Sequence, residues 1–233
     1  MKKYITISLL LALLSGCKED IDGKYERQFY RSLVQDYETT DSLSVKFDRY
    51  YNAYMIIHHR DELIAKRTNE YKYNLLCVKN NDMSFNMETV FITMNAYTEA
   101  VCANDFVSIA LVSDIDFDAV HPAGTSLADI VEFRTASPKR YIDSGYTEEY
   151  RYPDEREFDF YPHTFMYKWF WPVRARMSEL TEYDLSMMKS GDGVLAAFRF
   201  IRRPAAAGEH GMTLTMTTDE GKAFTARFKA VFE

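Results

Sequence analysis

The feature that most constrains the fold is a strict alternation of apolar and polar side chains near the C-terminus. Residues 212–217 alternate methionine or leucine with threonine, and residues 224–232 place phenylalanine or alanine at every second position. A period of two is typical of a β-strand with one face on a core and the other in water. Gly221, between the two segments, suits a tight turn. The pattern therefore predicts a terminal antiparallel β-hairpin.

Several other short apolar segments predict further strands. They lie at 42–47, 54–57, 71–78, 89–94, 105–112 and 194–201. Short helices are expected at 127–133, capped by Ser126, and at 178–185, where Ser178 is the cap. Because strict alternation of strands and helices is missing, we expect an all-β fold, an immunoglobulin-like antiparallel β-sandwich with minor short helices. It would form a single domain over 28–233, with a subdivision near 95–104.

The N-terminus has the features of an export signal. Lys2 and Lys3 precede an apolar run at 5–14, which is far shorter than the about 20 apolar residues of a membrane-spanning helix. Residues 1–16 therefore fit a signal peptide. The small residues before Cys17 resemble the lipobox of bacterial lipoproteins, in which the chain is cut before the cysteine and its thiol and amine are acylated. The alternative is an ordinary signal peptide followed by a chance cysteine.

The residues after Cys17 indicate where a lipidated chain would be displayed. Lys18, Glu19 and Asp20 are similar to the surface-export signal of Bacteroidetes-type lipoproteins, and 17–27 would form the lipidated tether. We therefore expect an outer-membrane, lipid-anchored protein at the cell surface, with a periplasm-facing anchor as the alternative. Loss of the two lysines of the signal peptide changes the net charge from −7 to −9. This acidic balance argues against nucleic acid as a partner and leaves membrane attachment to the lipid.

Two longer stretches resemble a known group of proteins. Residues 105–130, with a strand and an acidic segment, and residues 198–228, with a loop before the last hairpin, are similar to an uncharacterised family of Bacteroidetes cell-envelope lipoproteins. The resemblance implies an envelope lipoprotein with a β-sandwich. It implies no catalytic residue.

Two cysteines remain once Cys17 is assigned to the lipid. Cys77 and Cys102 form an even pair in an exported chain, which favours a disulfide that closes the loop between them. The alternative is two buried free thiols in strands. Spacing alone does not decide between them.

The sequence holds no motif for catalysis, a cofactor or a metal. His58 and His59 are adjacent, so on a strand they would point to opposite faces, and the acidic segment 114–118 lacks the glycine and glutamate that a calcium loop requires. Signatures of nucleophilic serine, phosphate-binding or dinucleotide-binding sites are missing. We therefore expect no enzymatic activity and no cofactor. Paired carboxylates for glycoside hydrolysis stay open, because their separation is three-dimensional.

One aromatic segment is a candidate binding surface. Residues 158–172 contain both tryptophans, and Tyr167, Trp169 and Trp171 could form a face for a glycan or an envelope protein. The alternative is that these rings fill the core. The function we expect is a non-catalytic binding or adhesion module of unknown ligand. A structural or assembly component of an envelope or fimbrial complex is the alternative, and a glycan hydrolase is the least favoured.

Overall fold

Strands dominate the structure, a computed structural model that describes residues 25–92, 100–151 and 169–233, with the backbone alone at 25–30 and 87–92. The strands are β1 (Tyr25–Tyr30), β2 (Asp36–Asp48), β3 (Ala53–Ala65), β4 (Met87–Ile92), β5 (Val101–Cys102), β6 (Phe106–Ser113), β7 (Val131–Ser137), β8 (Trp171–Arg176), β9 (Val194–Phe200), β10 (Gly208–Thr218) and β11 (Ala223–Phe232). The helices are α2 (Glu70–Lys79), α3 (Lys139–Asp143) and α4 (Glu182–Leu185), with 3₁₀ turns η2 (Ala128–Ile130) and η4 (Met177–Glu179).

The chain divides into two compact units, Met1–Tyr30 with Asn86–Tyr97, and Arg31–Phe85 with Thr98–Glu233. In the first unit β1 pairs with β4 in an antiparallel ladder. The single domain over 28–233 and its subdivision near 95–104 stay predictions. The expected signal peptide and lipidated segment, 1–20, lie outside the described residues.

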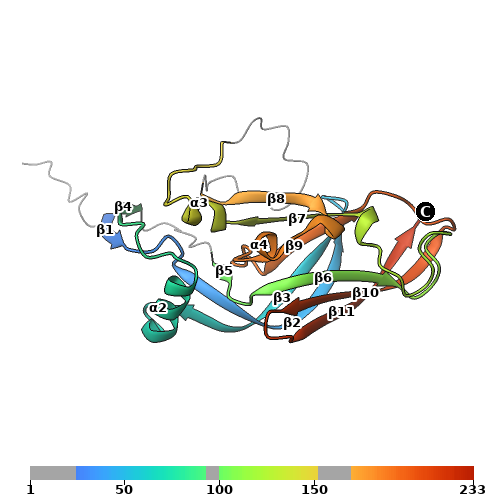
Figure 1. Ribbon diagram of the computed structural model, residues 1–233, viewed down its shortest axis with the longest axis horizontal. Coiled ribbons are helices and arrows are strands. Elements are labelled where there is room, and N and C mark those ends of the chain that lie inside the picture. Colours follow the sequence, from blue (N-terminus) through green and yellow to red (C-terminus); the bar gives the residue numbers. More distant parts are fainter. Residues whose placement is uncertain (1–24, 93–99, 152–168) are drawn as a thin grey trace, which may run out of the picture. The chain divides into compact units, whose positions relative to one another are not determined.

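The second unit contains two sheets that share one apolar core. A six-stranded sheet has the order β5-β2-β3-β9-β7-β8, and a three-stranded sheet has the order β11-β10-β6 (Figure 1). All neighbouring strands are antiparallel except β2 and β5, which run parallel. Phe133 and Phe198 of the larger sheet meet Leu214 and Phe224 of the smaller one in the main buried cluster. The prediction of an all-β sandwich with minor short helices is confirmed.

The terminal hairpin follows the predicted alternation. β10 pairs with β11 so that Met212 lies opposite Phe228. Phe224, Ala226 and Ala230 are buried, while the residues between them are exposed or half-buried. Because side chains of a strand alternate between its faces, this register places the apolar set on the core.

Helix α2 corrects the strand predicted at 71–78. Asn69 caps the helix, because its Oδ1 accepts a hydrogen bond from the N–H of Lys72 at 3.1 Å. Tyr73 and Cys77, four residues apart, fall on one side of the helix and are buried. A short apolar run alone does not distinguish a strand from a buried helix face. The helices predicted at 127–133 and 178–185 reduce to η2 in the first case, and to η4 and α4 in the second.

The predicted disulfide does not form in the structure. Cys77 and Cys102 are both free and buried, and they belong to different apolar clusters. Cys77 packs in the same apolar cluster as Tyr73. The Cys102 sulfur lies 3.7 Å from the hydroxyl of Thr40. Burial raises the pKa of both thiols, that of Cys102 to about 11. Both therefore remain protonated, inert thiols at neutral pH.

Candidate functional site

The predicted aromatic surface separates into parts with different surroundings. Tyr167 lies outside the described residues. Trp169 turns toward the core, where its ring stacks on Tyr141 with centroids 6.2 Å apart and meets the edge of Phe85 at 5.5 Å. Its indole nitrogen is buried and has no hydrogen-bond partner in the structure as described. Trp169 is half-buried and packs against the core cluster between α3 and the segment before β4. That it belongs to a binding surface stays a prediction.

Trp171, in contrast, lies at a groove. It is the first residue of β8, and its indole N–H donates to the carbonyl of Glu148 at 2.9 Å. The guanidinium carbon of Arg140 lies 3.8 Å from the centre of the ring, and the ring of Tyr150 lies 5.1 Å away. Trp171 thus joins the start of β8 to α3 and to the loop after it.

The groove runs between β8, α3 and α4 and has a cavity volume of about 260 Å³. Its polar and aromatic lining comes from Lys139 and Arg140 of α3, Trp171 and Arg174 of β8, and Tyr183 and Asp184 of α4. β8 is an edge strand, paired with β7 on one side (Figure 1). The two short helices have defined starts: Pro138 directly precedes α3, and Thr181 and Asp184 cap α4 reciprocally.

The lining carries three cationic side chains and one carboxylate. The ammonium of Lys139 pairs with Asp143 at 2.7 Å, four residues later in the same helix. The two arginines bond differently, since each uses Nε: Arg140 to Glu148 and Arg174 to Glu132, both at 3.1 Å. Their side chains are 53% and 56% exposed. The terminal nitrogens of both guanidinium groups therefore remain accessible to a ligand.

Arg174 also belongs to a cluster of arginines around one glutamate. Glu132 of β7 receives ion pairs from Arg134 at 2.8 Å, and from Arg174 and Arg199 at 3.1 Å each. Burial alone would raise the pKa of Glu132, but the arginines outweigh it and hold the pKa below its usual value. Glu132 therefore stays ionised and links β8 to β7 and β9.

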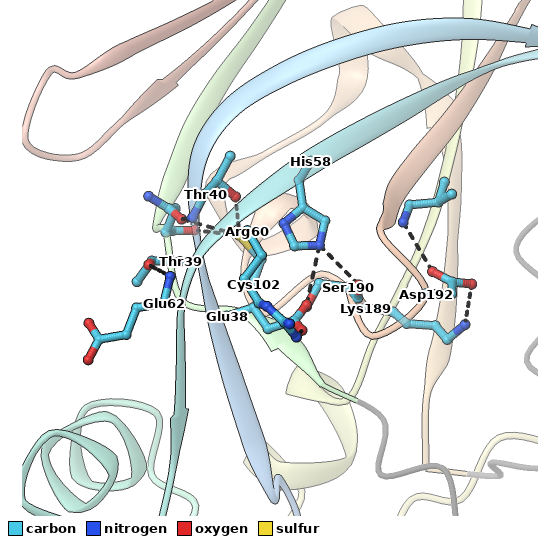
Figure 2. Close-up of polar contacts among 12 residues, drawn as sticks. Glu38, Thr39, Thr40, His58, Arg60, Glu62, Cys102, Lys189, Ser190 and Asp192 are labelled. Atoms are coloured by element: carbon cyan, nitrogen blue, oxygen red, sulfur yellow. Dashed lines mark hydrogen bonds and ion pairs between the residues drawn. The ribbon is translucent and has the colours of Figure 1, made fainter. Parts of the chain in front are cut away.

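A second polar cluster is buried under β2 and β3. Nε2 of His58 lies 3.3 Å from Oε2 of Glu38 and 3.0 Å from the carbonyl oxygen of Ser190, as Figure 2 shows. Arg60 binds the other carboxylate oxygen at 2.8 Å. Both neighbours of Nε2 are acceptors, so this nitrogen carries a proton. Near by, Lys189 pairs with Asp192 at 3.0 Å.

This cluster holds a serine, an imidazole and a carboxylate, the three groups of nucleophilic catalysis. In that chemistry the carboxylate binds one imidazole nitrogen and the hydroxyl binds the other. Here the carboxylate and the Ser190 carbonyl share Nε2, while neither Nδ1 of His58 nor the Ser190 hydroxyl completes a hydrogen bond. Ser190 is also fully buried. In this arrangement the cluster fastens the 186–193 loop to β2 and β3 and is not open to a substrate.

The aspartates of the acidic segment 114–118 stabilise neighbouring loops through hydrogen bonds and an ion pair. Asp114 accepts the N–H of Gly211 at 2.9 Å, and Asp116 accepts that of Ala123 at 2.8 Å. Asp118 pairs with His121 at 2.7 Å. Among the residues with described positions, no group of three or more histidine, cysteine, aspartate or glutamate side chains could hold a metal ion.

Trp171 could be identified from the sequence, but its partners in the groove could not. Arg140, Arg174 and Tyr183 come from three segments that are separated along the chain. One local signal was present: in 172–176 a proline and two arginines alternate with apolar residues, which is typical of an exposed strand face.

No protein-family model, curated protein or solved structure matches the chain. Within the described segments, no helix has the length and apolar character to cross a membrane. The groove and the N-terminal sequence are therefore the two features that point to a function.

Proposed function

We propose that this chain is a non-catalytic binding module, held at the cell surface by a lipid on Cys17, that takes its ligand in the groove between β8, α3 and α4. The observation that carries the proposal is the lining of that groove. Exposed tyrosine, half-buried tryptophan and accessible arginine come together there. These are the residue types that contribute most to binding energy in known interfaces.

The contacts that hold the groove residues in place favour binding over catalysis. β8 is fixed by its ladder with β7, and Trp171 is fixed by Glu148 and Arg140. A site whose side chains are already held loses less conformational entropy when a ligand binds. Among the described residues of the lining, Asp184 is the one with a carboxylate, and its Oδ2 already accepts from Thr181 at 2.7 Å. A glycoside hydrolase requires two facing carboxylates, so this part of the lining supports binding.

The surface location is supported by the N-terminal sequence. Cys17 follows a signal peptide, and Lys18, Glu19 and Asp20 follow Cys17. Several acyl chains anchor a protein stably, whereas one chain holds it only marginally. A net negative chain gains little from anionic head groups, so the lipid would carry the attachment.

The test is a binding screen with the full mature chain on immobilised glycans and peptides. Tyr183→Ala removes an aromatic ring of the groove that is 47% exposed, and Tyr71→Ala removes a ring of α2 that is 75% exposed and lies outside it. We expect Tyr183→Ala to weaken binding of the retained ligand by about tenfold, equivalent to about 1.4 kcal/mol. Tyr71→Ala should leave it unchanged. Equal binding by both variants, or no retained ligand at all, would contradict the proposal.

A further inference from the structure

We infer that the exposed apolar side of helix α2 lies on the surface of the bilayer that holds the lipid anchor. The inference rests on the proposed function, because it requires the lipid at Cys17, and it adds which side of the molecule meets the membrane. It depends on three observations: the exposure of this side of α2, its place beside the entry of the N-terminal tether, and its small size.

Helix α2 carries apolar side chains on two opposite sides. Tyr73 and Cys77 are buried and pack on the core. Tyr71, Leu75 and Val78 are spaced by four and three residues, which places them along one line of the helix, and they are 75%, 52% and 63% exposed. These three residues form the α2 face. Single exposed apolar side chains are ordinary, but a contiguous exposed patch of them marks an interaction surface.

The tether that would carry the lipid enters the second unit beside α2. This unit begins at Arg31, 14 residues after Cys17, and 14 extended residues span at most about 50 Å. The hydroxyl of Tyr73 donates to the carbonyl of Val34 at 2.7 Å, and the N–H of Val34 donates to Asp82, just after α2, at 2.8 Å. A lipid at Cys17 would therefore keep the α2 end of this unit nearest to the bilayer.

The size of the α2 face favours a bilayer over a protein partner. A stable protein interface takes about 20–30 residues from each side, whereas the α2 face supplies three exposed apolar side chains on a helix of ten residues. An interfacial helix inserts its apolar side chains by only about 5–10 Å into the boundary between head groups and acyl chains. Because the anchor already holds the chain at the membrane, this second contact needs little affinity of its own.

The surroundings of the α2 face suit the head groups. Lys72 and Lys79 are exposed beside it, and their ammonium groups pair with Glu62 and Asp105. A lysine stem can lie along an apolar surface while its charged end stays in water. Tyr71 suits the same boundary, because tyrosine combines an apolar ring with a polar tip. Only uncharged side chains would then enter the apolar layer.

The experiment attaches an environment-sensitive nitrobenzoxadiazole label to one added cysteine in the full, lipidated mature chain. Cys77 and Cys102 are buried, inert thiols, so Leu75→Cys is labelled selectively. The chain is placed on phosphatidylcholine vesicles, with and without a doxyl quencher on the acyl chains. We expect a blue shift of the label at position 75 and its quenching by the doxyl lipid. Val231→Cys, a 63% exposed position at the opposite end of the second unit, should show neither (Figure 1).

A second labelled position and the groove control keep the test specific. Val78→Cys lies on the same α2 face and should behave like Leu75→Cys. Tyr71→Ala remains a control for the groove, because the ligand screen contains no bilayer and this variant keeps its acyl chains.

The other outcomes would overturn the inference in different ways. Equal signals from positions 75 and 231, in a chain that floats with the vesicles, would reject the membrane contact and leave the anchor in place. A blue shift at position 75 in Cys17→Ala without vesicles would mean that another part of this chain or a second copy covers α2. A shift in intact cells but not on vesicles would assign the α2 face to a protein partner. A wild-type chain that does not float would contradict the anchor as well.

Discussion

At the scale of single residues, the buried carboxylate of Glu38 connects several elements outside the groove. His58 and Arg60 bind its two oxygens and join β2, β3 and the loop at Ser190. Burial alone would raise the pKa of Glu38, but hydrogen bonds from His58 and Arg60 outweigh it and lower the pKa. The ionised form therefore stabilises the folded chain.

Glu38→Gln tests this contribution, because it keeps the shape of the side chain and removes its charge. Hydrogen bonds to charged groups contribute about 1.5–3 kcal/mol, and a broken buried pair costs about 3–5 kcal/mol, so we expect the free energy of unfolding at pH 7 to fall by about 2–4 kcal/mol. Exposed Asp61→Asn, on the same strand as His58, should change it by less than about 0.5 kcal/mol. Urea titrations measure both.

The difference in unfolding free energy between the wild type and Glu38→Gln should also depend on pH. A carboxyl group with a lowered folded-state pKa adds stability above its unfolded pKa of about 4.3 and loses it as the pH falls through the folded-state value. The difference between wild type and Glu38→Gln should therefore shrink below about pH 4. A difference that stays constant on acidification would show that Glu38 is not ionised in the folded chain.

His121 is expected to give the opposite pH dependence. Its Nδ1 lies 2.7 Å from Asp118 and its Nε2 3.0 Å from Asp129. The hydrogen bond to Asp118, and then that to Asp129, raise the pKa of His121 against the opposing effect of burial. Stability from this bridge is fully present below the unfolded pKa of about 6.5 and is lost as the pH rises through the folded-state pKa.

His121→Gln should therefore reduce the free energy of unfolding more at about pH 6 than at about pH 8.5. Denaturant titrations at the two pH values measure the difference. An NMR titration in which the His121 ring changes charge at or below about pH 6.5 would contradict the raised pKa.

At the scale of the elements, the terminal hairpin gives the sharpest stability test. Phe224 is buried and meets Phe106 with ring centroids 5.6 Å apart, while Arg227 is exposed on the other face of β11. Phe224→Ala should lower the free energy of unfolding by about 3–5 kcal/mol, because it leaves a cavity in the core. Arg227→Ala should change it by less than about 0.5 kcal/mol. Reversed effects in a denaturant titration would mean that the register is shifted by one residue.

The elements also show what the sequence could and could not predict. The alternation of apolar and polar residues over 212–232 predicted the hairpin and its buried face, because a period of two is typical of a β-strand with one face on the core. The segment 71–78 was assigned wrongly because its apolar residues fit a strand and a short helix equally well. The groove could not be predicted from the sequence, because α3, β8 and α4 are separate segments of the chain that come together only in the folded structure. Trp169 and Trp171 share a parity, yet only Trp171 lines the groove.

At the scale of the whole molecule, the proposed surface display depends on the proposed lipid anchor at Cys17. Cleavage and acylation require the thiol of Cys17, so metabolic labelling with an alkyne fatty acid should mark the wild type and not Cys17→Ala. Cys77→Ala is the matched control and should keep the label, because that thiol is buried on α2. A labelled Cys17→Ala chain would contradict the anchor.

Capture of a labelled ligand by intact cells tests the anchor and the groove together. Cells that produce the wild-type chain should retain the ligand found in the binding screen, and protease added outside should remove both the domain and the retained ligand. Cells with Tyr183→Ala at the same surface level should retain about tenfold less, and cells with Tyr71→Ala should match the wild type. Equal retention by the Tyr183→Ala and wild-type cells would contradict the account.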